Sequence, residues 1–215
     1  MPATLNFSIN GQKVFPNLDA LEGRAPSFAH EISVQEGIIV LVDISGFTKF
    51  VKQIDPHVGV HVIHELLNTI ITQNEFELHV NEIEGDAVLF YKIGQPLTMR
   101  QIIHQFESMS ASFHEKLTSF NPVLREHNLS LKMIVHYGAF SVYQIDGFTK
   151  LYGIPVIEAH RLLKNSIGGN HYLLVTQEYL KVAGEDLEDS PYTLQLCEIY
   201  EDVGALCYHF LTRIK

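Results

Sequence analysis

The chain has 215 residues, of which 46% are hydrophobic and 10% aromatic, enough for one domain with a sizeable core. Its formal net charge is −10, and no run of Lys and Arg could follow a phosphate backbone, so we expect no nucleic-acid partner. The first apolar run, residues 38–42, is far shorter than the roughly 20 residues of a membrane span, and no signal region precedes it. We therefore expect a cytoplasmic protein without a membrane span.

The first half of the chain predicts a strand, a helix and two further strands. Residues 1–36 contain the turn-forming segments "NGQKVFPN" and "GRAPS", and we interpret them as an extension before a domain of residues 37–215. The domain opens with a buried strand over residues 37–43. A helix follows from Asp55, which can cap it, and Pro56, which suits its first turn. Two strands within residues 77–91 are joined at residues 84–86.

The second half continues the alternation of helices and strands. A helix begins near Thr98, where "TMRQ" has the form of a capping box. A strand in "LSLKMIVHYGAFSVYQ", a helix over about residues 155–165, and strands near residues 171–175 and 192–212 follow. The order β-α-β-β-α-β with extra C-terminal strands predicts an α+β fold, a ferredoxin-like sandwich with helices backing one sheet.

Two carboxylates interrupt this pattern. Asp43 ends the first strand and Asp86 lies at the hairpin tip, and in this topology the two strands are neighbours, so the acids can converge. Two acids at one sheet edge can hold divalent cations that act on phosphates. The backbone N–H groups after Asp43 lead through Gly46, Phe47 and Thr48 into a short helix, which can cradle a phosphate. Taken singly, Asp43 can also be a helix cap and Asp86 an ordinary turn residue.

Three sequence motifs, two of which contain Asp43 and Asp86, together suggest a more specific role for these acids. In order and spacing, "VDISGFT", "EIEGDAVLFY" and "LYGIPVIEAHRL" resemble the motif series of class III nucleotidyl cyclases over about residues 37–175. The chain looks closest to an uncharacterised bacterial branch sharing "DISGFTKFV", "EIEGDA" and "AHRLLKN". The resemblance implies two Mg²⁺ or Mn²⁺ ions per site, held by Asp43, Asp86 and the backbone of Ile44. It also implies that Arg161 meets the transition-state charge, and that the site forms in a homodimer where the acids of one chain face Arg161 of the other.

The chain departs from that family at three places. Ile157 replaces an asparagine that orients the ribose, and isoleucine cannot form that hydrogen bond. Val203 stands near the position of a triphosphate-binding lysine. Glu82 and Lys150 occupy the two base-reading positions and match neither the adenylyl nor the guanylyl pair.

The pair of Glu82 and Lys150 suits guanine better than adenine. A carboxylate can face the N–H donors of guanine while an ammonium faces its O6, so GTP is slightly favoured over ATP as the nucleoside triphosphate. The alternative is that the two side chains pair with each other across the dimer and close the base pocket.

These observations leave two functions open. One is an enzyme of weak or altered activity that converts a nucleoside triphosphate into a cyclic monophosphate and pyrophosphate. The other is a catalytically inactive nucleotide-binding module with a regulatory or interaction role. Ile157 favours the second, whereas Asp43, Asp86 and Arg161 favour the first.

Two further groups of residues, the two cysteines and three histidines of one predicted helix, could form a disulfide or bind a metal. We expect Cys197 and Cys207 to be reduced thiols packed in the core, although a terminal hairpin could place them opposite each other. His57, His61 and His64 fall on one helix face opposite the apolar one, and we expect them to face solvent. Zinc binding or pH sensing is the alternative for these histidines.

Overall fold

The structure, a computed structural model, describes residues 8–9, 12–13, 33–120, 122–185, 187 and 194–212. The chain divides into a unit of residues 1–32 and a unit of residues 33–215. The smaller unit holds two short antiparallel strands, β1 (Ser8–Ile9) and β2 (Gln12–Lys13). The prediction that residues 1–36 form an extension lies largely outside the described residues.

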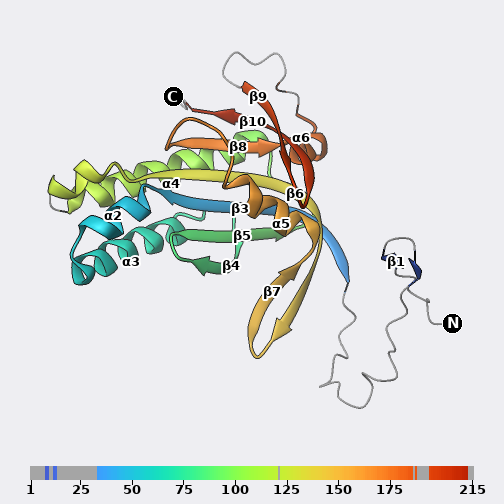
Figure 1. Cartoon of the computed structure of the whole chain (residues 1–215), viewed down its shortest axis with the longest axis horizontal. Helices are drawn as coiled ribbons and strands as arrows, with labels where there is room; N and C mark the ends of the chain where they lie inside the picture. The colour runs from blue at the N-terminus through green and yellow to red at the C-terminus, as the bar shows by residue number, and fades with distance from the viewer. Residues whose placement is uncertain are drawn as a thin grey trace. The chain divides into compact units, whose positions relative to one another are not determined.

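The larger unit is built on one eight-stranded sheet (Figure 1). The strand order is β4-β5-β3-β6-β8-β10-β9, and β7 pairs with β6 beside this path. Of the strand pairs in this sheet, only β6 with β8 is parallel. The strands are β3 (Val34–Ser45), β4 (His79–Glu84), β5 (Ala87–Ile93), β6 (Ser130–Ile145), β7 (Phe148–Tyr152), β8 (Tyr172–Thr176), β9 (Leu194–Tyr200) and β10 (Gly204–Leu211).

Helices lie on both faces of the sheet and create two cores. They are α2 (Phe47–Gln53), α3 (Pro56–Thr72), α4 (Met99–Ser119), the 3-10 helix η1 (Pro122–His127), α5 (Ile154–Leu162) and α6 (Gln177–Ala183). Alternate residues of β3, such as Val40 and Leu41, enter different cores. The first core packs against α2, α3, α4 and α6, and the second packs against α5. Because both faces of β3 are buried, residues 38–42 form an uninterrupted apolar run. The mixture of helices and strands confirms the predicted α+β fold class.

Two helices start where the sequence predicts them. The carboxylate of Asp55 accepts hydrogen bonds from the backbone N–H groups of His57, at 2.9 Å, and Val58, at 3.3 Å. Thr98 and Gln101 form a complete capping box, in which each side chain accepts from the backbone N–H of the other. Both caps satisfy N–H groups that a helix start otherwise leaves unpaired.

Helix α5 ends earlier than predicted and lies close to the sheet. The Asn165 side chain donates to the backbone oxygen of Leu162 at 2.6 Å, which satisfies a carbonyl at the helix end and stops the helix before residue 165. A side chain at Gly138 of β6 would collide with the ring of Pro155 in the first turn of α5. Glycine at residue 138 therefore lets α5 lie directly on β6.

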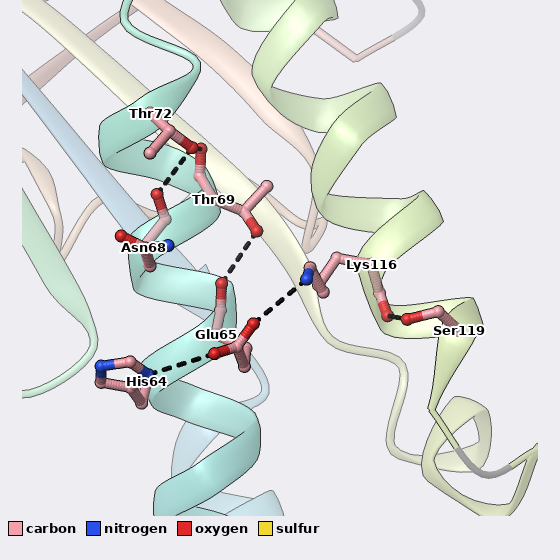
Figure 2. Close-up of polar contacts among 7 residues, drawn as sticks. All are labelled: His64, Glu65, Asn68, Thr69, Thr72, Lys116 and Ser119. Atoms are coloured by element: carbon pink, nitrogen blue, oxygen red, sulfur yellow. Dashed lines mark hydrogen bonds and ion pairs between the residues drawn. The ribbon is translucent and has the colours of Figure 1, made fainter.

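The three histidines of α3 are exposed, as predicted. Figure 2 shows the contacts beside them, where Glu65 accepts from Lys116 of α4 at 3.1 Å and lies 3.4 Å from the Nδ1 of His64. Within the described ranges, no three His, Cys, Asp or Glu side chains are grouped as a metal site. Among the described helices, none has both the length and the apolar content that crossing a membrane requires.

The expectation of reduced core thiols is wrong. Cys197 of β9 and Cys207 of β10 are register partners and form a disulfide, and Cys197 is exposed. The short turn between the strands places the two residues directly opposite each other. The alternative pairing within the terminal hairpin is therefore the correct one.

We predict that denatured, unreduced protein contains no free thiols. Closing a loop with a sequence separation of 10 should stabilise the fold by about 3 kcal/mol, so reduction should lower the melting temperature. Thiol titration with Ellman's reagent and thermal unfolding with and without reductant test both statements. Two reactive thiols in unreduced, freshly purified protein would contradict the disulfide.

Candidate functional site

Asp43 lies inside β3, with strands on both sides. Its register partners are Ala87 of β5 and Lys132 of β6, and its carboxylate oxygen is 3.6 Å from the Lys132 ammonium. Burial raises the pKa of Asp43, and the charge of Lys132 lowers it in part. The strand continues to Ser45, so the prediction that it ends at residue 43 is wrong, and so is the alternative that Asp43 caps a helix.

Asp86 lies in the tight turn between β4 and β5, close enough to Asp43 for their charges to interact. Gly85 precedes it with a φ of 60°, and the backbone N–H of Ile44 donates to the Asp86 backbone oxygen at 3.1 Å. Burial, followed by the negative charge of Asp43, raises the pKa of Asp86 to about 6. The structure thus brings Asp43, Ile44 and Asp86 together, and their role as metal ligands stays a prediction.

The backbone turns sharply into α2 immediately after these residues. Gly46 is the N-cap of α2 and has a φ of 87°, which favours glycine. Gly46 and Thr48 are exposed and Phe47 is half-buried. Their backbone groups follow Asp43 directly, and the role of Gly46, Phe47 and Thr48 in phosphate binding stays a prediction.

Two residues of this cluster were not singled out from the sequence. Lys132 is the only ion-pair partner of Asp43 in the described part of the chain. Its signal is a charge within the otherwise apolar segment "LKMIV". The hydroxyl of Ser45 is buried and has no hydrogen-bond partner among the described residues, which is unusual for a buried polar group.

The predicted base-reading residues form a second cluster. Lys150 of β7 donates to Glu82 of β4 at 2.6 Å, and the Nε2 of His160 on α5 is 3.9 Å from the same carboxylate. The Asn81 side chain donates to the Thr149 backbone oxygen at 2.9 Å, which links the same two strands. The alternative to guanine recognition was that Glu82 and Lys150 pair across a dimer; the two side chains do pair, but within one chain.

Arg161 follows His160 on α5 and has its own partner. Its Nε and Nη2 atoms lie 2.8 and 2.6 Å from one carboxylate oxygen of Asp202, in the turn between β9 and β10. Ile157, one turn earlier on α5, is 45% exposed, and Val203 packs at the edge of the second core. Within the described ranges, no hydrogen bond or ion pair joins Arg161 to Asp43 or Asp86.

The donor atoms beside Asp43 suit a hard divalent cation. Two carboxylates and a backbone oxygen offer oxygen ligands only, which Mg²⁺ and Mn²⁺ accept. Two carboxylates also suffice, because Mg²⁺ is commonly bound by one or two protein carboxylates together with substrate phosphates. Burial and then the charge of Asp43 raise the pKa of Asp86 to about 6, and a bound cation would offset both effects by stabilising the ionised carboxylates.

Comparisons of the sequence with known proteins find a family model and a relative. The family model described as "Protein of unknown function (DUF2652)" matches residues 63–172, about half of the chain. The uncharacterized protein Rv2561/Rv2562 of Mycobacterium tuberculosis (strain ATCC 25618 / H37Rv) is 25% identical over 158 residues, 68% of this chain and 71% of that protein.

Solved cyclase structures share the fold at low sequence identity. The adenylyl cyclase CyaB from P. aeruginosa has a TM-score of 0.56 and 15% identity, covering 86% of this chain and 98% of that one. The guanylate cyclase domain of RhGC from Catenaria anguillulae, solved with GTP, has a TM-score of 0.61 and 14% identity, covering 84% and 98%. The predicted class III cyclase fold is therefore confirmed.

We predict that Asp86 titrates near pH 6 in metal-free protein. Between pH 3.8 and about 6 the folded chain keeps a proton that the unfolded chain has released, so this group's contribution to the free energy of unfolding falls as pH rises through that range. Asp43→Asn should move the titration to lower pH, because it removes one cause of the shift.

Carboxyl-carbon NMR of chelator-treated protein measures this titration directly. Asp55→Asn is the matched control, because it removes a charge that does not act on Asp86 and keeps a residue that caps helices well. An Asp86 midpoint near pH 4 in the unsubstituted protein would contradict the geometry of the pair.

Proposed function

The chain belongs to the DUF2652 family of proteins of unknown function, and from its fold and site we propose a class III cyclase-like domain that binds a nucleoside triphosphate with divalent cations. The observation that carries this proposal is the pair of Asp43 and Asp86 beside the N-terminus of α2. A chain that used this fold only as a scaffold would have no need for an acid in the central strand β3 beside a second acid in the β4–β5 turn.

The first cluster supports binding of the metal and the phosphates. Asp43, Asp86 and the backbone oxygen of Ile44 would hold Mg²⁺ or Mn²⁺, two ions per site. When bound, such ions lower the pKa of an attacking hydroxyl and stabilise leaving phosphate oxygens. Lys132 adds a positive charge beside the acids that phosphate oxygens can share, and Gly46, Phe47 and Thr48 offer backbone donors next to it.

The second cluster supports recognition of the base and of the reacting phosphate. Glu82 and Lys150, the two residues expected to read the base, are hydrogen-bonded to each other, and Arg161 follows His160 on α5, whose Nε2 is 3.9 Å from Glu82. The Arg161 guanidinium can stabilise negative charge that grows on an α-phosphate when the 3′-hydroxyl attacks it. The products of that reaction are a cyclic monophosphate and pyrophosphate.

We propose a homodimer because, among the residues that the structure describes, no hydrogen bond or ion pair joins Arg161 to Asp43 or Asp86. A two-fold axis places Asp43 and Asp86 of one copy opposite Arg161 of the other and creates two equivalent sites. In this arrangement each nucleotide contacts both copies, so the complete site exists only in the dimer.

A second candidate function is an inactive nucleotide-binding module with a regulatory or interaction role. Three observations favour it: Glu82 and Lys150 are already paired, Arg161 is engaged by Asp202, and Ile157 cannot hydrogen-bond a ribose. Product analysis of samples incubated with GTP or ATP separates the two functions, because the module binds nucleotide without forming cyclic monophosphate.

Asp43→Ala and Asp86→Ala should each weaken binding of GTP with Mn²⁺ or Mg²⁺ by at least tenfold, on the order of 1.4 kcal/mol. Either substitution leaves a cation with too few ligands. Isothermal titration calorimetry measures the affinities, and Glu115→Ala, which removes an exposed acid from α4, is the matched control. Unchanged affinity in the Asp43→Ala protein would contradict the site.

GTP should bind better than ATP, and Glu82→Lys should abolish or reverse the difference. Adenine presents an amino donor to the Lys150 ammonium, and an unsatisfied buried donor costs about 1–3 kcal/mol. Competition between the two nucleotides at fixed Mg²⁺ measures the preference. Equal affinities would instead indicate that the Glu82–Lys150 pair stays closed and reads no base.

A further inference from the structure

We propose that Asp202 sequesters Arg161 within its own chain and limits its availability to a bound nucleotide; this inference rests on the proposed function. The two residues lie 41 positions apart in the sequence, in α5 and in the β9–β10 turn. Asp202 therefore acts on a bound nucleotide only through its contact with the Arg161 guanidinium.

Asp202 contacts two nitrogen atoms of the Arg161 guanidinium. Both the Nε and the Nη2 of Arg161 approach the same oxygen of Asp202, at 2.8 and 2.6 Å. The hydrogen bond from Arg161 lowers the pKa of Asp202, and the nearby charge of Lys164 lowers it further. The carboxylate is therefore ionised at neutral pH and offsets the charge that Arg161 would otherwise present to a phosphate.

The hairpin that carries Asp202 is anchored to the segment after α5. The Glu198 carboxylate of β9 accepts from the backbone N–H and hydroxyl of Ser166, at 2.8 and 2.7 Å, and from the hydroxyls of Tyr208 and Tyr200, at 2.6 and 2.8 Å. Although burial acts in the opposite direction, these hydrogen bonds lower the pKa of Glu198 to about 2. The position of Asp202 beside α5 is thus fixed by a network of contacts.

The ion pair between Arg161 and Asp202 is weak enough for a phosphate to replace Asp202 as the partner of Arg161. The side chains of Arg161 and Asp202 are 40% and 42% exposed, and ion pairs of this kind contribute little net stability. A triphosphate with several negative oxygens can therefore compete with Asp202 for the guanidinium. Removing the carboxylate should shift this competition toward the nucleotide without affecting the core.

The test substitutes Asp202 and compares it with its neighbour. Asp202→Asn keeps the shape of the side chain and removes its charge. Glu201→Gln removes the same charge from the adjacent, exposed position of the turn and is the matched control. Modification by phenylglyoxal, followed by peptide mass spectrometry, reports the availability of the Arg161 guanidinium, and exposed Arg100 on α4 is the internal standard.

We expect Asp202→Asn to speed modification of Arg161 by about two- to fivefold relative to Arg100, the range expected for loss of an exposed ion pair. Glu201→Gln should leave the rate unchanged. Equal Arg161 modification rates in Asp202→Asn and in the unsubstituted chain would overturn the proposal.

Nucleotide turnover provides a second readout. With GTP and Mn²⁺, Asp202→Asn should raise kcat by about two- to fivefold with little change in KM, because the freed charge acts mainly on the transition state. The effect should vanish in an Arg161→Ala background. A lower kcat in Asp202→Asn would overturn the proposal, since it would mean that Asp202 orients Arg161 for catalysis.

The two readouts separate failure of this inference from failure of the proposed function. If the unsubstituted chain and all its variants bind no nucleotide and form no product, the proposed function falls, and the modification rates alone decide whether Asp202 sequesters Arg161. If nucleotide binds and Arg161 reacts equally in both proteins, the proposed function stands and this inference falls.

Discussion

The charge of one half-buried carboxylate, Asp43 in the central strand β3, governs the candidate site. Asp43 is covered because β3 pairs with β5 on one side and β6 on the other, and its side chain is only 17% exposed. Burying a charge is costly unless an opposite charge compensates it. Lys132 supplies one positive charge, but Asp86 adds a second negative one from the turn that precedes β5. The pair is therefore left with unmet negative charge, which is what a bound cation would neutralise.

Around α5 and β7 the cations, and not the acids, are the residues of interest, and each of them already has a partner of opposite charge. Lys150 and Arg161, which the proposed reaction requires as cations, are each paired with an acid of the same chain, Glu82 and Asp202. Asp43 and Asp86 thus carry more negative charge than their neighbouring lysine offsets. Lys150 and Arg161, in contrast, are already paired with acids. A nucleotide that carries metal ions would supply cations to Asp43 and Asp86 and compete for Lys150 and Arg161. This contrast gives a physical reason why a chain that keeps the fold can have low or regulated activity.

Local signals in the sequence predicted most of the fold. Caps such as Asp55 and Thr98 act through hydrogen bonds within a few residues, so they can be read directly. The order of strands and helices followed from apolar periodicity in the same way. Helix α6 was missed because its seven residues make fewer than two turns and Thr176 is its main signal. The end of β3 was misplaced because a charged residue in an apolar run resembles a strand end, whereas pairing on both sides carries the strand to Ser45.

Contacts between distant segments were harder to predict. The motifs predicted Asp43, Asp86 and Arg161 as candidate site residues, but not the ion-pair partners Lys132 and Asp202, which depend on strand register and on how the terminal hairpin packs. The same limit applied to Cys197 and Cys207, whose pairing follows from the register of β9 and β10. It also applied to Glu82 and Lys150: their pairing was considered only as an alternative, across a dimer, and the two side chains meet within one chain.

The central claim is that Asp43 and Asp86 hold divalent cations against a nucleotide. A crystal structure of the protein with Mn²⁺ and a GTP analogue that lacks the 3′-hydroxyl, and so cannot cyclise, tests it most directly, because anomalous scattering distinguishes manganese from lighter atoms. The account predicts anomalous peaks about 2–2.5 Å from carboxylate oxygens of both residues, with the triphosphate beside them. Nucleotide bound with manganese elsewhere, or with no manganese beside Asp43 and Asp86, would contradict it.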